Sequence, residues 1–526
     1  MNAHSLVRTS VIVFLFLIGA KLLSFVKKLL IGQLFGVSWV ADAFFAASFL
    51  PYYLAIFFEG ILFLGFLPLF SQVMAEKGKE EANQFVGEIL ILVSVLTLTL
   101  TALAWWGTPW IIRELVPGFN EAEQGLTRSL FQVLSLVVIF ISLTSFFKAL
   151  NSFFGDYALA ASAPLVDTAV MIGVTLLSWK IWGIHGAAWA AVVGAATALL
   201  FQATSLFRRH LVFPRHWKLQ SAWLAKLFWF LIPMGAIWAF QQIPLVILNR
   251  FGSGMWEGTI SAMTISQTLT TVPMGLVSHT VLFAVFPSLA RQANETAPEG
   301  MRETFFQTLR FGFLILIPVG FLLTNFASPI TVLFFEGGGI SEEGTRRIAR
   351  SLACFGWATF ALYADLFMTQ SLIAVRKTVP AILLCGTRAV FTYGVGYFLS
   401  TYWDYQGLAL SFSLALVANF FFLFPVFFRL SPFTGVWGEL FRYSGKLIVA
   451  ASPAFLAGWV INQWPVEKWM DLSKGMLILW IGLGTLVLAG LYLLLLSWLK
   501  VGEVRPLFKG FRREVGTETL VASGAP

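Results

Sequence analysis

Several charged side chains interrupt long apolar stretches of this sequence. The cations among them are Lys21, Lys27, Lys28 and Arg388, and the acids include Asp42, Glu59, Glu88, Asp167 and Asp365. A charge at the centre of a bilayer costs at least about 2.5–3.5 kcal/mol on insertion scales, so such a side chain usually faces a polar cavity or a partner. These residues are therefore the first candidates for a binding site.

Three of the lysines recur along one stretch near the N-terminus. Lys21 and Lys28 are seven residues apart and share one face of a helix, and Lys27 lies near the edge of that face. A cationic cavity wall would attract an anionic headgroup such as a diphosphate. Asp42 follows near the start of the next predicted helix, close to the outer end of the first. The alternative is that Lys27 and Lys28 extend to the outer membrane interface and bind no substrate.

The other intramembrane charges have structural explanations beside functional ones. Arg388 can pair with Asp365 on the preceding predicted helix, or it can add positive charge to a cavity. Glu59 precedes a glycine and is compatible with a helix break that lines a cavity. Glu88 and Asp167 lie near predicted helix ends, where a structural role is favoured.

The sequence favours neither an enzyme nor a metalloprotein. The two cysteines, Cys354 and Cys385, lie in apolar runs, so no disulfide framework or zinc site is expected. None of the five histidines stands at a catalytic spacing from a carboxylate, and no Walker motif is present. We expect no cofactor, no metal ion and no direct use of ATP.

The composition is that of a membrane protein. Of 526 residues, 58% are hydrophobic and 12% are charged, and the mean hydropathy is +0.81. Soluble domains carry roughly 25% charged residues. The first apolar stretch lacks a small-residue cleavage site and continues into a full-length span, so we interpret it as a transmembrane helix and not as a cleaved signal.

Apolar windows predict an all-α membrane protein with about fourteen transmembrane helices. The predicted spans are 8–33, 40–70, 84–111, 127–151, 157–179, 184–207, 224–249, 259–289, 306–329, 348–373, 380–401, 407–428, 441–463 and 475–499. With this arrangement, 22 lysines and arginines fall on the side of the termini and nine fall on the other side. The bias places both termini in the cytoplasm and explains the net charge of +9 without a nucleic-acid partner.

The chain also repeats short signals at a nearly constant offset. Leu34-Phe35-Gly36 recurs as Arg250-Phe251-Gly252, Pro164 is matched by Pro380, and Gly186 is matched by Gly407, at offsets of 216, 216 and 221. Six spans separate the copies, so the repeats are parallel, as in some transporters. We predict two six-helix lobes at 1–210 and 211–430, two further helices at 431–500 and a basic cytoplasmic tail at 501–526.

A series of short motifs runs along nearly the whole chain. They include KLLSFVK at 21–27, LFG at 34–36, ADAFF at 41–45, FEG at 58–60, VPMGL at 272–276 and FPSL at 286–289. In their order and spacing the sequence resembles the MurJ (MviN) lipid II flippase family of the multidrug/oligosaccharidyl-lipid/polysaccharide exporter superfamily.

This resemblance implies a two-lobed, fourteen-helix flippase of the bacterial inner membrane. Such a protein moves lipid II, an undecaprenyl-diphosphate-linked peptidoglycan precursor, from the inner to the outer leaflet. It would thereby serve peptidoglycan synthesis, cell wall biogenesis and cell shape. The family holds the diphosphate with arginines on helices 1, 2 and 8, and carries an aspartate early in helix 2.

The family pattern is only partly present. The helix-1 arginines match Lys21 and Lys27, the aspartate matches Asp42, and the helix-8 arginine falls at Thr268. Lys28 stands where an acid usually follows, and residues 52–57 contain no counterpart of the helix-2 arginines. The candidate substrate-binding residues are Lys21, Lys27, Lys28, Asp42, Glu59, Thr268 and Arg388.

We therefore predict a monomeric flippase that works by alternating access, with a lipid-linked glycan and membrane lipids as its partners. Two alternatives stay open. One is a transporter of the same superfamily with another substrate, which the missing arginines favour: a flippase for another lipid-linked oligosaccharide, of the exopolysaccharide or O-antigen type, or a drug/cation antiporter. The other is a non-transporting scaffold of an envelope assembly machine.

Overall fold

The computed structural model describes residues 3–209, 222–292, 298–336, 338–375, 377–423, 437–461, 464, 466–499 and 501. Throughout this described part the regular structure is helical. The predicted basic tail lies outside the described residues, apart from Val501. The chain divides into two compact units, which are described separately.

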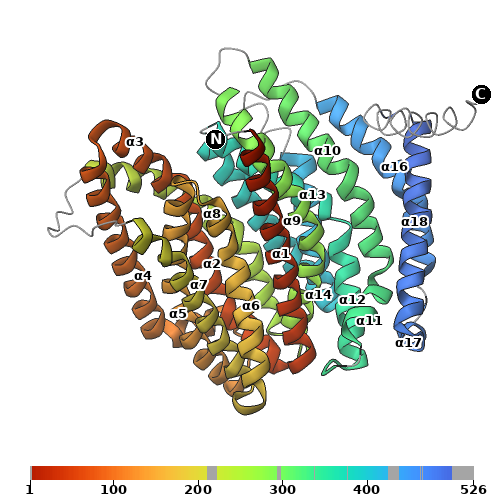
Figure 1. The fold of residues 1–526 in the computed structure, drawn as a ribbon. Coiled ribbons are helices and arrows are strands. Elements are labelled where there is room, and N and C mark those ends of the chain that lie inside the picture. Colours follow the sequence, from red (N-terminus) through yellow and green to blue (C-terminus); the bar gives the residue numbers. More distant parts are fainter. Residues whose placement is uncertain are drawn as a thin grey trace, which may run out of the picture. The chain divides into compact units, whose positions relative to one another are not determined.

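The first unit comprises residues 1–272, 335–351 and 378–415. Its helices are α1 (Ala3–Phe35), α2 (Trp39–Ile61), the π-helix η1 (Leu62–Phe66), α3 (Leu67–Lys77), α4 (Lys79–Leu115), α5 (Glu121–Phe153), α6 (Tyr157–Trp182), α7 (Ile184–Arg209), α8 (Ala222–Gly252), the start of α9 (Thr259–Gln292), most of α12 (Glu342–Gly356) and nearly all of α14 (Thr378–Ala418). Within it, α5 packs against α2, α4 and α7, while α6 packs against α1 and α7 (Figure 1).

The second unit comprises residues 273–334, 352–377 and 416–526. It contains the remainder of α9 and α12, together with α10 (Pro298–Asn325), most of α11 (Ala327–Phe335), α13 (Thr359–Ala374), the π-helix η2 (Asn419–Leu423), α16 (Trp437–Ile461), α17 (Val466–Met470) and α18 (Lys474–Trp498). In this unit α10 packs against α13 and α16, and α18 packs against α16. The predicted lobes at 1–210 and 211–430 follow from the sequence repeat and stay a prediction.

The predicted all-α membrane class is confirmed. Each of the fourteen predicted spans overlaps a helix of the described chain. Nine of the described helices are long and apolar enough to cross a membrane by themselves. The count becomes ten if α12 and α13, which are bent by 54° at their junction, form one broken span.

Local sequence explains where several helices begin and end. Gly36 ends α1 with a φ of 73°, and a Cβ there would lie 2.4 Å from the carbonyl oxygen of Gly339. Ser38 then caps α2, since its Oγ accepts a hydrogen bond from the backbone N–H of Ala41 at 3.4 Å. Asn120 and Glu123 form a capping box at the start of α5.

Two predicted spans contain breaks that position neighbouring side chains. The predicted span 40–70 consists of α2, the π-helix η1 and the start of α3, so its break follows Glu59 by three residues. The boundary between predicted spans 380–401 and 407–428 is a kink inside α14 at Trp403 and Asp404, where Asp404 has a φ of 50°. The kink in α14 coincides with the predicted boundary between these two spans, whereas the π-helix lies inside a predicted span, next to the Glu59-Gly60 pair.

The packed interior of the first unit lies where α2, α5 and α7 meet. Small residues allow the close approach, because Ala43, Ala46 and Ala187 are fully buried there. Larger side chains, including Phe131 and Leu134, fill the space between these helices. This packed layer supports α2, which forms part of the cavity described next.

Candidate binding cavity

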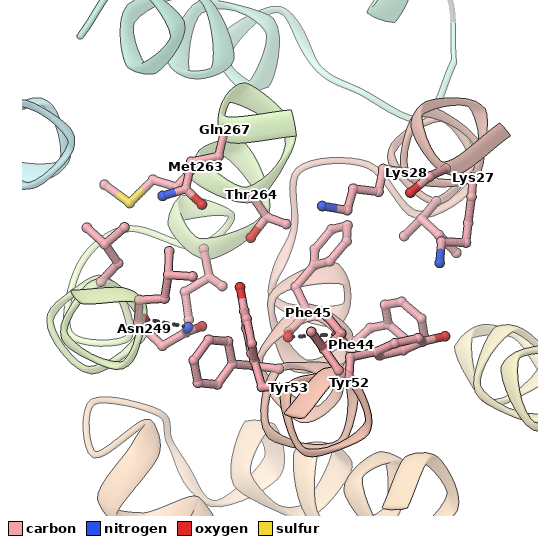
Figure 2. Close-up of a pocket in the computed structure, with 18 of the residues that line it drawn as sticks. Lys27, Lys28, Phe44, Phe45, Tyr52, Tyr53, Asn249, Met263, Thr264 and Gln267 are labelled. Atoms are coloured by element: carbon pink, nitrogen blue, oxygen red, sulfur yellow. Dashed lines mark hydrogen bonds between the residues drawn. The ribbon is translucent and has the colours of Figure 1, made fainter. Parts of the chain in front are cut away.

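A cavity of about 300 Å³ lies within the first unit between α1, α2, α8 and α9. Two predicted site residues, Lys27 and Lys28, line it from α1. Tyr52 and Tyr53 line it from α2, where the family's arginines are expected, and Figure 2 shows both tyrosines between its walls. The lining side chains lie in the following order along the chain: Ser24, Lys27, Lys28, Ile31, Phe44, Phe45, Ser48, Phe49, Tyr52, Tyr53, Ile56, Met171, Leu245, Leu248, Asn249, Ile260, Met263, Thr264 and Gln267.

The two lysines point in different directions. Lys27 extends toward α2, where its Nζ lies 5.1 Å from the ring centroid of Tyr52 (Figure 2). The carboxylate of Asp167 on α6 supplies an opposite charge that acts on Lys27. The aromatic face and the nearby carboxylate offset part of the cost of burying this ammonium group.

Lys28 reaches from α1 to α9. Its Nζ donates a hydrogen bond to Oγ1 of Thr268 at 2.8 Å, and that hydroxyl donates in turn to the backbone oxygen of Thr264 at 2.7 Å. Thr268 is the position at which the family's helix-8 arginine is expected. Lys28 therefore places a positive charge beside α9, at the position where an arginine is expected from the family and this chain has Thr268.

Asp42 is buried and binds backbone groups at the start of α9. Its Oδ2 accepts from the N–H of Gly258 at 2.8 Å, and its Oδ1 accepts from the N–H of Ser261 at 2.6 Å. The first N–H groups of a helix have no partner within the helix and carry the positive end of its dipole. Asp42 thus caps α9 from another helix, while its predicted role toward substrate stays a prediction.

Glu59 and Lys21 do not line this cavity. Glu59 forms an ion pair with Lys148 of α5, at the end of α2 before the π-helix. Lys21 is exposed on α1, and the opposite charge that acts on it is Glu59. The lysine face predicted from the spacing is therefore divided: Lys27 and Lys28 face the cavity, and Lys21 faces the Glu59 region.

Arg388 is buried on α14, and its Nη2 donates to the backbone oxygen of Gln241 on α8 at 2.9 Å. Gln241 follows Phe240, the residue whose carbonyl oxygen receives no N–H from Pro244 in the regular pattern of α8. Asp365 accepts a hydrogen bond from Nδ2 of Asn419 at 3.1 Å. Arg388 and Asp365 belong to different compact units, so their predicted ion pair stays a prediction.

The structure adds residues that the sequence interpretation did not select. Asn249, Thr264 and Gln267 form a neutral polar wall on α8 and α9, and Tyr52 and Tyr53 occupy the α2 side. Their signal in the sequence was their polarity within apolar spans, but helical position alone could not show which of them face one cavity. Asp167 was interpreted as structural, yet its charge acts on Lys27.

The arrangement suits recognition and not covalent chemistry. Within the described residues, no three His, Cys, Asp or Glu side chains are grouped so that they could hold a metal ion. The lining side chains instead combine two ammonium groups, aromatic rings and neutral amides. Such a set can bind a molecule with an anionic part and an uncharged polar part.

Comparison with known proteins points to one group. The family model described as "Lipid II flippase MurJ" matches residues 31–474. The probable lipid II flippase MurJ of Buchnera aphidicola subsp. Schizaphis graminum is 23% identical over 465 residues, which cover 86% of this chain and 90% of that protein. Its counterpart from Rhizobium tropici is 24% identical over 534 residues and covers 96% of this chain and 97% of that protein.

Solved structures show the same fold. A structure described as lipid II flippase MurJ in an inward closed conformation has a TM-score of 0.75 and 18% identity, with 97% of this chain and 99% of that chain covered. A multidrug resistance MATE family transporter of the MOP superfamily, in an inward-facing conformation, has a TM-score of 0.65 and 17% identity over 81% of this chain and 95% of that chain.

Proposed function

Because the chain belongs to the MurJ family of lipid II flippases, we propose that it moves lipid II, a polyprenyl-diphosphate-linked peptidoglycan precursor, from the inner to the outer leaflet of a bacterial cytoplasmic membrane. The family is one of transporters and not of enzymes. In this proposal the polar headgroup crosses the membrane inside the protein while the lipid tail stays in the bilayer.

The observation that carries the proposal is the pair of lysines in the cavity. Lys27 and Lys28 place two cations among membrane-spanning helices. Charges there are energetically costly and usually face a cavity or a partner, so they often mark a binding site. A diphosphate offers two negative groups joined by one oxygen and can engage both ammonium groups at once. Lysine binds phosphate as a point charge without the paired geometry of arginine, so the contact tolerates small shifts of the headgroup.

The position of Lys28 offsets the missing helix-8 arginine. Its bond to Thr268 holds the ammonium against α9, so positive charge lies along both α1 and α9. The apolar tail leaves through a lateral opening, and the two lobes rock to expose the cavity to each side in turn. We place both termini in the cytoplasm and take the monomer as the working unit.

Complementation of a bacterium depleted of its own lipid II flippase tests this function. The intact chain is expected to restore growth and normal cell shape. Lys27→Ala should abolish rescue, because it removes one of the two cavity cations. Lys77→Ala, at an exposed position of α3, should rescue fully at the same membrane abundance. Failure of the intact, membrane-inserted chain to rescue would reject the peptidoglycan assignment.

A second candidate function is the transport of another lipid-linked oligosaccharide, of the exopolysaccharide or O-antigen type. It is favoured by Tyr52 and Tyr53 on α2 and by Thr268 on α9, since none of them carries the charge expected at these places. Rescue of a strain that lacks such a flippase, without rescue of the peptidoglycan strain, would select this alternative. Full rescue of the peptidoglycan strain by Lys27→Ala would refute the role proposed for that lysine, whereas a scaffold that does not transport would rescue neither strain.

A further inference from the structure

The side chains that α8 and α9 contribute to the cavity are uncharged. Among the described residues that line the cavity, the cations are Lys27 and Lys28, and both belong to α1. Across from them, α8 contributes Asn249 and α9 contributes Thr264 and Gln267 (Figure 2). A headgroup that fills the space therefore meets the two ammonium groups carried by α1 and, from α8 and α9, neutral hydrogen-bonding groups.

Gln267 presents a donor that nothing in the described chain uses. Its Nε2 is shielded from solvent, and no acceptor among the described residues lies within hydrogen-bonding distance. Buried donors of this kind are uncommon because they lose water without gaining a partner. Gln267 lines the cavity, and a half-turn of its amide, whose two ends differ little in shape, presents Nε2 to a bound molecule that can supply the missing acceptor.

Asn249 complements this donor with an acceptor. Its Nδ2 donates to the backbone oxygen of Leu245 at 2.9 Å, four residues earlier in the same helix (Figure 2). This bond fixes the amide and leaves Oδ1 as the atom that can accept from the cavity. Met263 and Leu248 line the cavity on the same two helices and supply apolar surface.

We propose that Gln267 and Asn249 form a subsite for a secondary amide, specifically the acetamido group of a sugar next to the diphosphate. The carbonyl oxygen of the acetamido group accepts from Nε2 of Gln267, its N–H donates to Oδ1 of Asn249, and its methyl group packs against Met263 and Leu248. Resting on the proposed function, this assignment adds residues that determine which glycan the site accepts.

The physical basis of selectivity is the cost of unpaired polar groups. A sugar with a hydroxyl in place of the acetamido group is too short to satisfy the donor of Gln267 and the acceptor of Asn249 together. Sites built around such hydrogen bonds reject analogues that leave them unpaired more strongly than apolar pockets reject a change in size. The lysines bind the phosphates in either case, so selectivity and diphosphate affinity are separable.

The test uses the full-length protein in nanodiscs and two short-chain polyprenyl diphosphate sugars that differ only in an acetamido or a hydroxyl group. The wild type is expected to bind the acetamido lipid about tenfold more tightly. Gln267→Met, which keeps the length of the side chain without its amide, should bring this ratio close to one and leave the affinity for the hydroxyl lipid nearly unchanged. Asn249→Leu should act in the same direction.

Two control variants separate the possible outcomes. Ser24→Ala, which alters the same cavity on α1, should preserve the preference, while Lys27→Ala should weaken both lipids equally. A wild type that binds both lipids equally, or a Gln267→Met that weakens both equally, overturns the subsite but leaves the proposed function intact. A wild type that binds neither lipid overturns both.

A third lipid distinguishes the source of the amide. It carries the same acetamido sugar with an attached peptide, which also contains secondary amides. If Gln267→Met affects the peptide-bearing lipid alone, the assignment to the sugar is overturned in favour of the peptide. An equal effect on both acetamido lipids supports the sugar.

Discussion

Lys28 and Thr268 illustrate how a binding wall changes when single residues are exchanged. The family carries an arginine on helix 8 and an acid after the helix-1 cation, whereas this chain carries Thr268 and Lys28 at these places. The 2.8 Å hydrogen bond between them joins α1 to α9 and brings the ammonium group to α9. We infer that the positive charge is relocated between helices and not lost.

A double exchange at these positions tests the relocation. Lys28→Glu removes a cavity cation and adds an anion, so transport should fall by about tenfold or more, a change of about 1.4 kcal/mol or more. Adding Thr268→Arg rebuilds the family's pairing and should recover most of the loss, because the two side chains are in contact and their effects are not additive. The measurement is flipping of a fluorescent lipid-linked substrate in proteoliposomes.

Thr268→Arg by itself serves as the control. It adds a cation beside Lys28 and should not raise transport, so the recovery in the double variant can be assigned to the pairing of the two exchanged side chains. If the double variant is as inactive as Lys28→Glu, the contact between Lys28 and Thr268 does not carry the positive charge that substrate binding needs.

At the scale of helices, Asp42 joins α2 to the start of α9. Both of its carboxylate oxygens accept from backbone N–H groups, at Gly258 and Ser261, and the group is 2% exposed. The turn before α9 is tight, since Gly258 has a φ of 85° and a Cβ there would lie 2.4 Å from Val37. The acid thus holds two helices that both line the cavity.

Removing this cap is expected to destabilise the protein. Asp42→Ala leaves two buried N–H groups without an acceptor and should cost about 1–3 kcal/mol for each group that stays unsatisfied. Asp42→Asn keeps one acceptor oxygen and should cost less. Thermal unfolding of the detergent-solubilised protein measures the order, with Glu81→Ala at an exposed position of α4 as the control. Equal Tm values for Asp42→Ala and wild type would refute the capping role.

For the molecule as a whole, the distribution of lysines and arginines predicts on which side of the membrane the termini lie. The bias of 22 lysines and arginines to nine predicts that both termini are cytoplasmic. In this arrangement the loop between α3 and α4 is cytoplasmic, and the loop between α4 and α5 is external. Lys79 and Glu121 are exposed at the starts of α4 and α5 and mark these two sides.

Labelling of single cysteines tests the orientation. In a chain with Cys354→Ala and Cys385→Ala, Glu121→Cys should react with a membrane-impermeant maleimide in intact spheroplasts. Lys79→Cys should react only after permeabilisation, because the bilayer keeps the reagent from the cytoplasmic side. The reverse pattern would invert the topology and would place the termini outside.

Much of the architecture is readable from the sequence because a bilayer imposes strong local rules. Helices in lipid must satisfy their own backbone groups and present long apolar surfaces, so windows of hydropathy predict them well. The predicted boundary near 402–406 coincides with the kink at Trp403 and Asp404 for this reason. The family, which motifs along most of the chain predicted, is confirmed by the family model that matches residues 31–474.

The sequence by itself determined the membrane class, the helices, the family and the two lysines as candidates, since these follow from composition, periodicity and local motifs. Only the tertiary structure decided that Lys27 and Lys28 line a cavity with Asn249 and Gln267, that Asp42 caps α9, and that Glu59 pairs with Lys148. Such contacts join residues between 89 and 240 positions apart. Hydropathy cannot report them, because they depend on how each helix is rotated against its neighbours.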